Sequence, residues 1–545
     1  MKKDEIIRNI EQKIDNAYKN YKLYQLQNRP LAQWYLLLMH EESIRLPIID
    51  KLNKGKPLDW FEIICSIEAA KGALQFALKW IDELPNGKFR MPREIDWDLY
   101  GYAQDFFFLA QNYYRVIGPF TLYSRGLASA IAENATTIRF ERDPQESAFD
   151  VLGLIKMQDP VRTLVRRDKI PQKIEEELEL VLMSAKPLDY HNITYKVNHK
   201  NLAPAISYWF NEMSKDTYLP DEWSIRGVSA IELRRFFASI RSLCMIHLRC
   251  TSRLDILSHV EAAAPASALL SKRSDDWMRF ITRCAGISAE KVKSIIDILT
   301  YDRNMVKRDI SLQPFVKIAD ENLTICPYLV YNSNLERNFL SLVAKKFKTE
   351  YDNQSYLFEE IMISRCANIA ERAKLIFSCK RKIIGSQSLP DIDAAFYDSS
   401  SNCLLVCQLK AVIPPSEPAE VLERAEREHE GIEQAKVIKK IGEQSPELLW
   451  KSCFDELDYL SPKIFCAVLL KGSFGSSHSL NNNIPSLELE HFAEMVDKYD
   501  LLINLCEHIS SFSYLPKEGI DYDKVDSIIE FEENKIICEG FSARS

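Results

Sequence analysis

Apolar residues follow two different patterns along this chain. Through most of the first half they recur every three or four positions, whereas the second half also contains short continuous apolar runs. The first spacing predicts amphipathic helices, and the second predicts buried strands. Helical spacing covers four long segments, with breaks expected between them and at Gly118-Pro119: residues 31–45, 60–84, 99–132 and 230–259. The pattern therefore predicts a mostly α-helical region, which we place at residues 1–307, with a division into two subdomains near 187–225 as an alternative.

The second half combines predicted helices with predicted strands. A short hairpin is expected over residues 310–327 and a helix over 332–347. Farther along, the apolar spacing predicts two longer helices and four strands: helices at 356–377 and 417–443, and strands at 389–397, 404–410, 463–470 and 484–489. Gly, Ser and Asn residues predict a loop over 472–483. We therefore expect a mixed α/β domain over residues 308–545, which makes the fold class an α+β multidomain protein.

Three polar residues interrupt the first two of these strands. Asp393 lies in one strand, and Gln408 and Lys410 lie in the next. Since residues two apart in a strand share a face, Gln408 and Lys410 should project together while Leu409 points into a core. Mg²⁺ prefers oxygen ligands such as carboxylates and amide carbonyls. An aspartate on the neighbouring strand would therefore complete a metal site.

The sequence Pro390-Asp391, followed by Asp393 and then by Gln408-Leu409-Lys410, resembles the motif of the PD-(D/E)XK nuclease superfamily. Glutamine at the first position of the second element is similar to the variant of Mrr-like restriction endonucleases. The resemblance implies a restriction-endonuclease-like domain that hydrolyses phosphodiester bonds with Mg²⁺ or Mn²⁺. It implies that Asp393 and Gln408 hold the metal, that Asp391 supports them, and that Lys410 holds the attacking water or stabilises the transition state. Because an amide brings no charge, metal affinity should be weaker than in an all-carboxylate site.

Two flanking helices supply further candidates. Glu359 lies on the apolar stripe of the helix predicted over 356–377, where an unpaired carboxylate would be costly. The resemblance implies that Glu359 is a further catalytic and metal-binding residue, although a first-turn glutamate favoured by the helix dipole is an equally good interpretation. Gln434 lies at the edge of the apolar stripe of the helix over 417–443. The resemblance implies that Gln434 supports the site, and a solvated side chain is the usual alternative.

The formal net charge of −8 argues against a chain coated for nonspecific nucleic-acid binding, so nucleic acid must meet local basic patches. Lys380, Arg381 and Lys382 precede the aspartate strand, and Lys436 lies on the helix after the lysine strand. We expect these four residues to contact nucleic acid. Two other basic groups favour solvated helical surface instead: Arg162, Arg166, Arg167, Lys169 and Lys173, and Arg234, Arg235, Arg241, Arg249 and Arg253.

Composition limits the setting without deciding the function. The 545 residues, 46% hydrophobic and 27% charged, are ordinary for a globular protein with two or more domains. No apolar run reaches the length of a membrane span and no signal-peptide core follows Met1, so we expect a cytoplasmic protein without membrane partners. Thirteen scattered cysteines favour reduced thiols, and the nine histidines show no ligand spacing. We therefore expect no structural zinc and interpret His429 as a surface helix residue.

The resemblance implies an Mg²⁺-dependent endonuclease, a hydrolase acting on phosphodiester bonds, with DNA preferred over RNA. It also implies bacterial genome defence, such as antiviral defence, or DNA processing as the setting. Since one active site cuts one strand, cleavage of both strands predicts a homo-oligomer. Two alternatives stay open. The domain could keep the nuclease fold while being catalytically silent, binding nucleic acid or a partner protein, or the helical region could hold the nuclease inactive until it senses a ligand.

Overall fold

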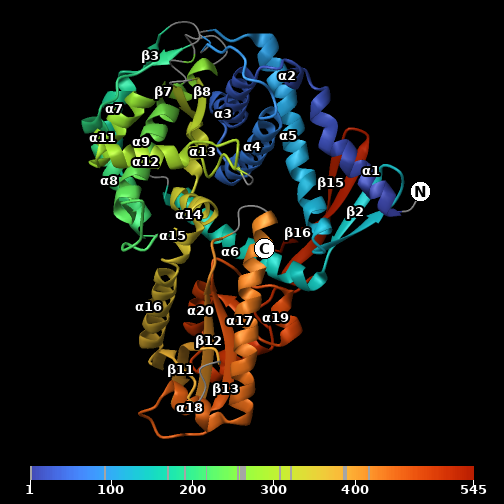
Figure 1. Cartoon of the computed structure of the whole chain (residues 1–545), viewed down its shortest axis with the longest axis vertical. Coiled ribbons are helices and arrows are strands. Elements are labelled where there is room, and N and C mark those ends of the chain that lie inside the picture. The colour runs from blue at the N-terminus through green and yellow to red at the C-terminus, as the bar shows by residue number, and fades with distance from the viewer. Residues whose placement is uncertain are drawn as a thin grey trace.

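The computed structural model describes residues 3–90, 92, 94–167, 171–188, 192–215, 218–253, 257, 265–305, 308–319, 322–384, 389–414 and 418–544. Helices form most of its upper part, and a five-stranded sheet lies in its lower part (Figure 1). The predicted fold class, an α+β multidomain protein with a mostly helical N-terminal region, is confirmed.

Three long helices form the core of the N-terminal part. These are α3 (Arg29–Asn53), α4 (Trp60–Ile81) and α5 (Trp97–Ser124), and their buried side chains join one hydrophobic cluster. Asn28 caps the start of α3 by accepting the N–H of Leu31. The apolar spacing and the cap agree in placing this helix, which matches the prediction over 31–45.

The C-terminal end of α5 corrects two predictions. The expected break at Pro119 is wrong, because this proline lies inside the helix and the neighbouring Phe120 is buried in the core. The helix predicted over residues 99–132 ends at Ser124, and β1 (Ala128–Ala132) occupies the end of that range. α5 therefore leads directly into a sheet.

A second helical core surrounds α9 (Ala230–Thr251), which begins with a capping box formed by Ser229 and Glu232. The helix predicted over 230–259 is thus confirmed up to Thr251, and most of the remaining range lies outside the described residues. The other elements before residue 353 are mostly shorter: α1 (Lys3–Asn16), η1 (Ala17–Asn20), α2 (Lys22–Gln25), α6 (Pro144–Arg167), α7 (Gln172–Met183), β3 (Lys186–Pro187), β4 (Ile193–Thr194), α8 (His199–Lys215), β5 (Ser224–Ile225), β6 (Val228–Ser229), η3 (Pro265–Ser267), β7 (Leu270–Arg273), α11 (Ser274–Ala285), α12 (Ala289–Leu299), β8 (Val316–Ala319), β9 (Asn322–Ile325), α13 (Pro327–Asn332), α14 (Leu335–Lys346) and α15 (Lys348–Asp352). The predicted hairpin over 310–327 is confirmed as the antiparallel pair β8 and β9.

The lower part of the molecule is built on a mixed sheet of five strands. Its order is β10-β11-β12-β13-β14, with the first two neighbouring pairs antiparallel and the last two parallel. The strands are β10 (Ile376–Arg381), β11 (Ile392–Asp398), β12 (Cys403–Ala411), β13 (Lys463–Lys471) and β14 (Ser486–Glu488). Four of them correspond to the four strands predicted in this region.

Helices cover both faces of this sheet. One face packs against α16 (Tyr356–Ala373), α20 (Leu489–Val496) and α21 (Leu502–Ser510), and the other packs against α17 (Pro418–Gln444) and α18 (Pro446–Cys453). Along β12, Cys407 and Leu409 belong to the first core, and Val406 belongs to the second. Gln408 and Lys410 therefore lie on the α17 side of the sheet, because side chains alternate along a strand.

Two predictions in this domain need correction. The helix predicted over 356–377 ends at Ala373, because Lys374 adopts a left-handed backbone conformation with φ 58°. The chain then forms β10, which the apolar spacing did not predict. The loop predicted over 472–483 contains a short helix, α19 (Ser477–Asn482).

A second sheet joins segments from distant parts of the sequence. β15 (Tyr522–Phe531) and β16 (Asn534–Ala543) form an antiparallel hairpin, and β16 runs parallel to β2 (Thr137–Arg142), which pairs with β1. Figure 1 shows this hairpin beside β2 and α1, above the five-stranded sheet. The sequence pattern did not predict β15 or β16.

The hydrophobic clusters combine residues from both sides of position 307. Ile310, Val316 and Ile536 share a cluster with α3, α4 and α5, while Phe149 of α6 packs in the core of the five-stranded sheet. The division into 1–307 and 308–545 stays a prediction. The hydrophobic cores do not separate at this position, because two of them combine residues from both sides of it. The compact unit around the sheet spans about residues 356–515.

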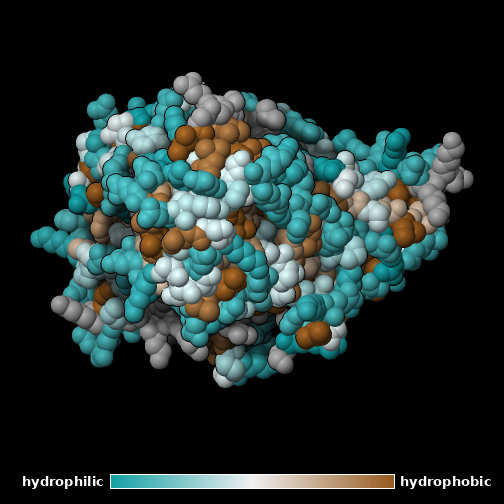
Figure 2. All heavy atoms as spheres, turned by 90° about the horizontal axis from the view of Figure 1, so that it is seen from below, coloured by the Kyte–Doolittle hydropathy of each residue, from teal (hydrophilic) through white to brown (hydrophobic). Residues whose placement is uncertain are grey.

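Among the described residues, no helix combines the length and the apolar character that crossing a membrane requires. Seen from below, the surface is largely hydrophilic, with hydrophobic side chains in several patches (Figure 2). Scattered apolar groups of this kind are ordinary on protein surfaces.

Candidate active site

Asp393 and the Gln408-Leu409-Lys410 segment meet at one edge of the five-stranded sheet. The antiparallel register pairs Ala394 with Cys407, so its continuation by one residue places Asp393 opposite Gln408. The backbone N–H of Leu409 donates to Asp393 Oδ2 at 2.8 Å. The structure thus brings together the aspartate and the glutamine-lysine pair that the sequence predicted, and fixes the carboxylate by a backbone hydrogen bond.

Gln408 is held by its amide nitrogen. The residue is 2% exposed, and its Nε2 donates to the backbone carbonyl of Asp391 at 2.7 Å. This bond leaves Oε1 as the end of the side chain with no hydrogen bond to a described residue, and Oε1 is the atom that could bind a cation.

Lys410 brings a positively charged side chain to this site. Its Nζ lies 3.6 Å from Glu430 Oε1 on α17, and its side chain is 16% exposed. Lys410 also lowers the pKa of Asp393, so the ammonium acts on both carboxylates. Lys410 lies between a half-buried aspartate and an exposed glutamate, and a bound substrate phosphate would offer it a third partner.

Asp393 is strained electrostatically. Its pKa is raised to about 6, chiefly by burial; the Leu409 N–H and Lys410 oppose the rise, and the negative charges of Glu359 and Asp391 add to it. Three carboxylates therefore lie close enough to repel one another. A divalent cation would relieve this repulsion, so the donor set fits a hard cation such as Mg²⁺ or Mn²⁺.

Glu359 and Asp391 contribute to this charge from the surface. Glu359 lies in the first turn of α16 and is partly buried, and Asp391 is exposed just before β11. Lys380, which is hydrogen-bonded to Glu360, also interacts electrostatically with Glu359. Both interpretations of Glu359 remain open, because the first-turn position and the proximity to Asp393 are both present.

Helix α17 covers the glutamine and lysine. It comes closest at Gly431, where a Cβ would lie 3.0 Å from Lys410 Cγ and 2.9 Å from Val468 Cγ1. One turn farther, Gln434 has a buried Oε1 without a hydrogen-bond partner among the described residues. An unpaired buried acceptor is costly, so Gln434 is better placed to assist a ligand than to stabilise the fold.

The residues predicted to bind nucleic acid are mostly engaged in surface ion pairs. Lys380 pairs with Glu360, Arg381 Nη2 lies 3.5 Å from Asp455 Oδ1, and Lys382 is exposed. Lys436 Nζ donates to Glu433 at 2.9 Å and to Asn482 Oδ1 at 3.0 Å. Exposed pairs of this kind are weak, so these side chains can exchange partners.

One basic group predicted as solvated helical surface is partly buried. Arg234 is 3% exposed, and its Nε donates to Glu336 Oε1 at 2.6 Å. Arg241 donates to the backbone carbonyl of Tyr331 at 2.8 Å. The prediction is wrong for Arg234, since a buried ion pair holds it inside the helical core. The side chains of the other group, from Arg162 to Lys173, lie outside the described residues.

A cluster of two histidines and a glutamate was not predicted. His429 and Glu433 lie four residues apart on α17, His478 lies on α19, and their ligand atoms all fall within 4.8 Å of one another. His429 is exposed, as expected, but it contacts His478 of another helix. The four-residue spacing on α17 was visible in the sequence, whereas the third member lies in a segment predicted as a loop.

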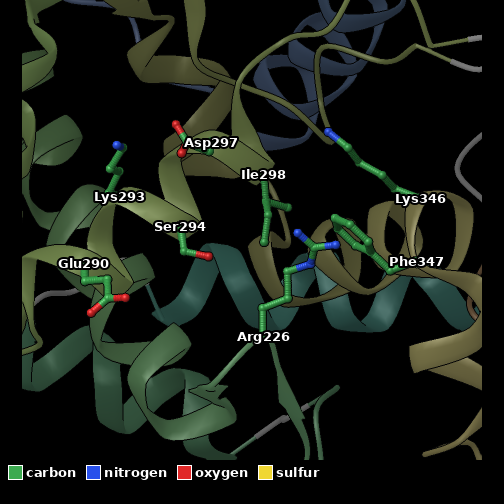
Figure 3. Close-up of a pocket in the computed structure, with 8 residues that line it drawn as sticks. All are labelled: Arg226, Glu290, Lys293, Ser294, Asp297, Ile298, Lys346 and Phe347. Carbon is green, nitrogen blue, oxygen red and sulfur yellow. The ribbon is translucent and has the colours of Figure 1, made fainter.

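A surface cavity of about 330 Å³ lies in the helical part, between α12 and the end of α14. Its lining combines Arg226, Lys293 and Lys346 with Glu290 and Asp297, as Figure 3 shows. The guanidinium of Arg226 stacks 4.3 Å from the ring of Phe347. None of the predicted site residues lines this cavity.

Comparison with models of known protein families, with curated proteins and with solved structures finds no match to this chain.

Proposed function

We propose that this chain is a metal-dependent nuclease that hydrolyses phosphodiester bonds, with its active site at Asp393, Gln408 and Lys410. The proposal rests chiefly on one observation: the Leu409 N–H holds Asp393 Oδ2 at 2.8 Å, so that the aspartate lies beside the glutamine and lysine of the neighbouring strand. The raised pKa of Asp393, at about 6, adds support, because perturbed carboxylates concentrate at functional sites.

Asp393, Glu359 and the Oε1 of Gln408 would hold Mg²⁺ or Mn²⁺, and the backbone carbonyl of Leu409 is a further oxygen donor. When bound, the cation supplies charge neutralisation at the phosphate and makes a water molecule more acidic. The Leu409 N–H orients Asp393 by a fixed bond, so the carboxylate does not have to reorganise when substrate arrives.

Lys410 would hold the attacking water or stabilise the negative charge that develops on the phosphate. For this the ammonium must leave Glu430, from which it lies 3.6 Å away. Such a partly exposed pair is weak, so a dianionic transition state competes with it easily. Gln434, with its unpaired Oε1, would accept a hydrogen bond from water or substrate.

DNA is the proposed substrate, and the resemblance of the sequence motif motivates a role in bacterial genome defence or DNA processing in the cytoplasm. The exposed side chains of Lys380, Arg381 and Lys382 would contact the phosphate backbone near the site, with Lys436 on α17. Double-strand cleavage would need a second active site, so we propose a homo-oligomer for that reaction.

Cleavage assays test the proposal directly. Duplex DNA, single-stranded DNA and RNA are incubated with wild type, Asp393→Ala and Lys410→Ala in Mg²⁺ or Mn²⁺. We expect cutting of DNA by wild type and a loss of at least about 100-fold in each variant. Lys451→Ala is the matched control, because this exposed lysine pairs only with its own helix at Glu447 and should leave the rate unchanged.

A catalytically silent binding module is the second candidate. It is favoured by two observations: Gln408 brings no charge to the cation site, and Glu430 already engages Lys410. If wild type cuts none of the substrates in either metal while nucleic-acid binding persists in both variants, the silent module replaces the nuclease. Cutting of RNA alone would keep the chemistry and change the substrate.

A further inference from the structure

A second set of possible cation ligands lies on the solvent side of α17, separate from Asp393. His429 and Glu433 occupy the same face of this helix, four residues apart, and His478 faces them from α19. The His429 and His478 rings lie with their centroids 4.2 Å apart, and His429 Nδ1 faces His478 Nε2. Three ligand atoms from two helices thus converge on one point.

We propose that His429, Glu433 and His478 bind a divalent transition-metal ion of the Zn²⁺ type, which would fasten α19 to α17. All three ligand atoms lie within 4.8 Å of one another. Around a tetrahedral zinc ion, neighbouring ligand atoms are about 3.3 Å apart, given bonds of about 2.0–2.1 Å. Small rotations of exposed side chains close this difference.

The surrounding residues orient these ligands as outer partners of a metal site do. Lys436 Nζ donates to Glu433 Oε1 at 2.9 Å and to Oε2 at 3.2 Å, and it also donates to Asn482 Oδ1 at 3.0 Å. Asn482 Nδ2 lies 3.2 Å from His478 Nε2. A cation would take one oxygen of Glu433, and Lys436 would keep the other.

The ligand types select the metal. Two imidazoles with one carboxylate suit Zn²⁺, Ni²⁺ or Co²⁺, whereas Mg²⁺ prefers oxygen ligands only. The Asp393 site offers oxygen donors alone. We therefore expect it to favour Mg²⁺ and the histidine site to favour Zn²⁺, Ni²⁺ or Co²⁺. The inference concerns α17 and α19 themselves and holds whether or not the Asp393 site cleaves nucleic acid.

Metal binding to tag-free, full-length protein tests the site, with excess Mg²⁺ present to occupy the Asp393 site. Zn²⁺ affinity is measured by competition with a chromophoric chelator, and Co²⁺ absorption reports whether the ligands are nitrogen and oxygen or thiolate. We expect one bound Zn²⁺ per chain in wild type and an affinity at least about 100-fold lower in His429→Ala and His478→Ala. His199→Ala, at an exposed histidine of α8, should bind like wild type.

Amide hydrogen exchange gives a second readout. Zn²⁺ should slow exchange in α19 of wild type and leave it unchanged in His429→Ala, since the metal joins the two helices. If His478→Ala fails to fold, His429→Ala and Glu433→Gln still decide, because both residues lie at the surface. Equal Zn²⁺ affinity in wild type and these variants, absence of Zn²⁺ binding, or a thiolate-type Co²⁺ spectrum would overturn the proposal.

Discussion

Carboxylates in two regions of this molecule have raised pKa values, and their surroundings differ. In the helical part, Glu41 and Glu42 of α3 are 0% and 3% exposed. Glu41 accepts the backbone N–H of Tyr328 at both oxygens, at 3.2 and 3.0 Å, and contacts His40 Nδ1 at 3.0 Å. Arg45 Nε donates to Glu42 Oε1 at 2.8 Å. Each of these carboxylates therefore accepts hydrogen bonds from nearby backbone or side-chain donors.

At the sheet edge, Asp393 has one backbone donor, the nearby ammonium of Lys410 and two like-charged neighbours, Glu359 and Asp391. Burial raises the pKa of Glu41 and of Glu42 as well, and the charge of Glu41 adds to the rise at Glu42, but hydrogen-bond donors oppose the rise at both carboxylates. This difference in surroundings suggests different roles for the two groups of carboxylates. On α3, His40 and Arg45 offset the carboxylates. At Asp393, the ammonium of Lys410 is set against three carboxylates, which is the arrangement in which we propose a divalent cation.

The largest expected effect comes from removing a donor in the satisfied region. Arg45→Ala leaves Glu42 buried without its partner, which should lower the free energy of unfolding by about 3–5 kcal/mol. Urea denaturation of the full chain measures this. The exposed Arg115 gives the matched control, since Arg115→Ala should change stability by less than about 0.5 kcal/mol. If Arg45→Ala lowers the free energy of unfolding by as little as the control does, the fold does not depend on the Arg45–Glu42 pair, and the proposed difference between the two regions is wrong.

The next effect has the opposite sign. Asp393→Asn removes a charge that the fold disfavours, so without metal at pH 8 it should raise the free energy of unfolding by about 1–2 kcal/mol, roughly half of a two-unit pKa shift at about 1.4 kcal/mol per unit. The matched control is Asp391→Asn, whose exposed carboxylate should give a smaller gain. Destabilisation by Asp393→Asn at pH 8 would contradict our account of the site.

The size of this stabilisation depends on pH. The folded-state pKa of Asp393, about 6, exceeds its ordinary value of 3.8, so the folded chain binds the extra proton between these values. Its contribution to stability is therefore present below about pH 4 and is lost as the pH rises through 6. Wild type and Asp393→Asn should thus be similar in stability near pH 4 and diverge above pH 6.

Metal affinity should show the third effect. Since Asp393 must lose its proton to bind a cation, Mn²⁺ affinity should fall about tenfold for each pH unit below about 6 and level off above it. Calorimetric titration from pH 5 to pH 8 measures this profile. A flat profile over that range would show that the cation does not depend on Asp393.

The smallest effect concerns the exposed partner of Lys410. Glu430→Gln breaks an ion pair whose glutamate is 47% exposed, so stability should change by less than about 0.5 kcal/mol. Because Lys410 is then freed for substrate, cleavage at low salt should rise a few-fold. Glu426→Gln, at an exposed glutamate of the same helix, should leave the rate unchanged. Slower cleavage by Glu430→Gln than by wild type would contradict this expectation and would indicate that the glutamate assists the proposed reaction.

The sheet was predictable where local pattern and buried environment agree. The strand predicted over 463–470 forms β13 from Lys463 to Lys471, because a continuous apolar run has few other stable environments. β10 was missed because Ile376 and Phe377 prolong the helical apolar spacing of α16, and the left-handed turn at Lys374 has no glycine to mark it. The pairing of β16 with β2 depends on long-range contacts that no local pattern contains.

The two proposed cation sites differ in how far the sequence predicts them. Asp393, Gln408 and Lys410 follow the two-residue period of neighbouring strands, so their approach could be inferred from the sequence. His478 lies 49 residues after His429, in a segment whose Gly, Ser and Asn residues predict a loop, so their contact depends on how α19 packs. The effect of Glu359 on the pKa of Asp393 could not be predicted from the sequence, because it depends on how the two residues are placed in the folded chain.

The pairing of β2 with β16 sets an order for the nascent chain. On the ribosome, β2 emerges with β1 long before residues 534–543 are translated, and one of its edges stays unpaired meanwhile. The domain around the five-stranded sheet is synthesised in the interval and has time to fold first. The parallel pairing of β2 with β16 can form only after β16 has been synthesised, so truncation before β15 would leave that edge of β2 unpaired.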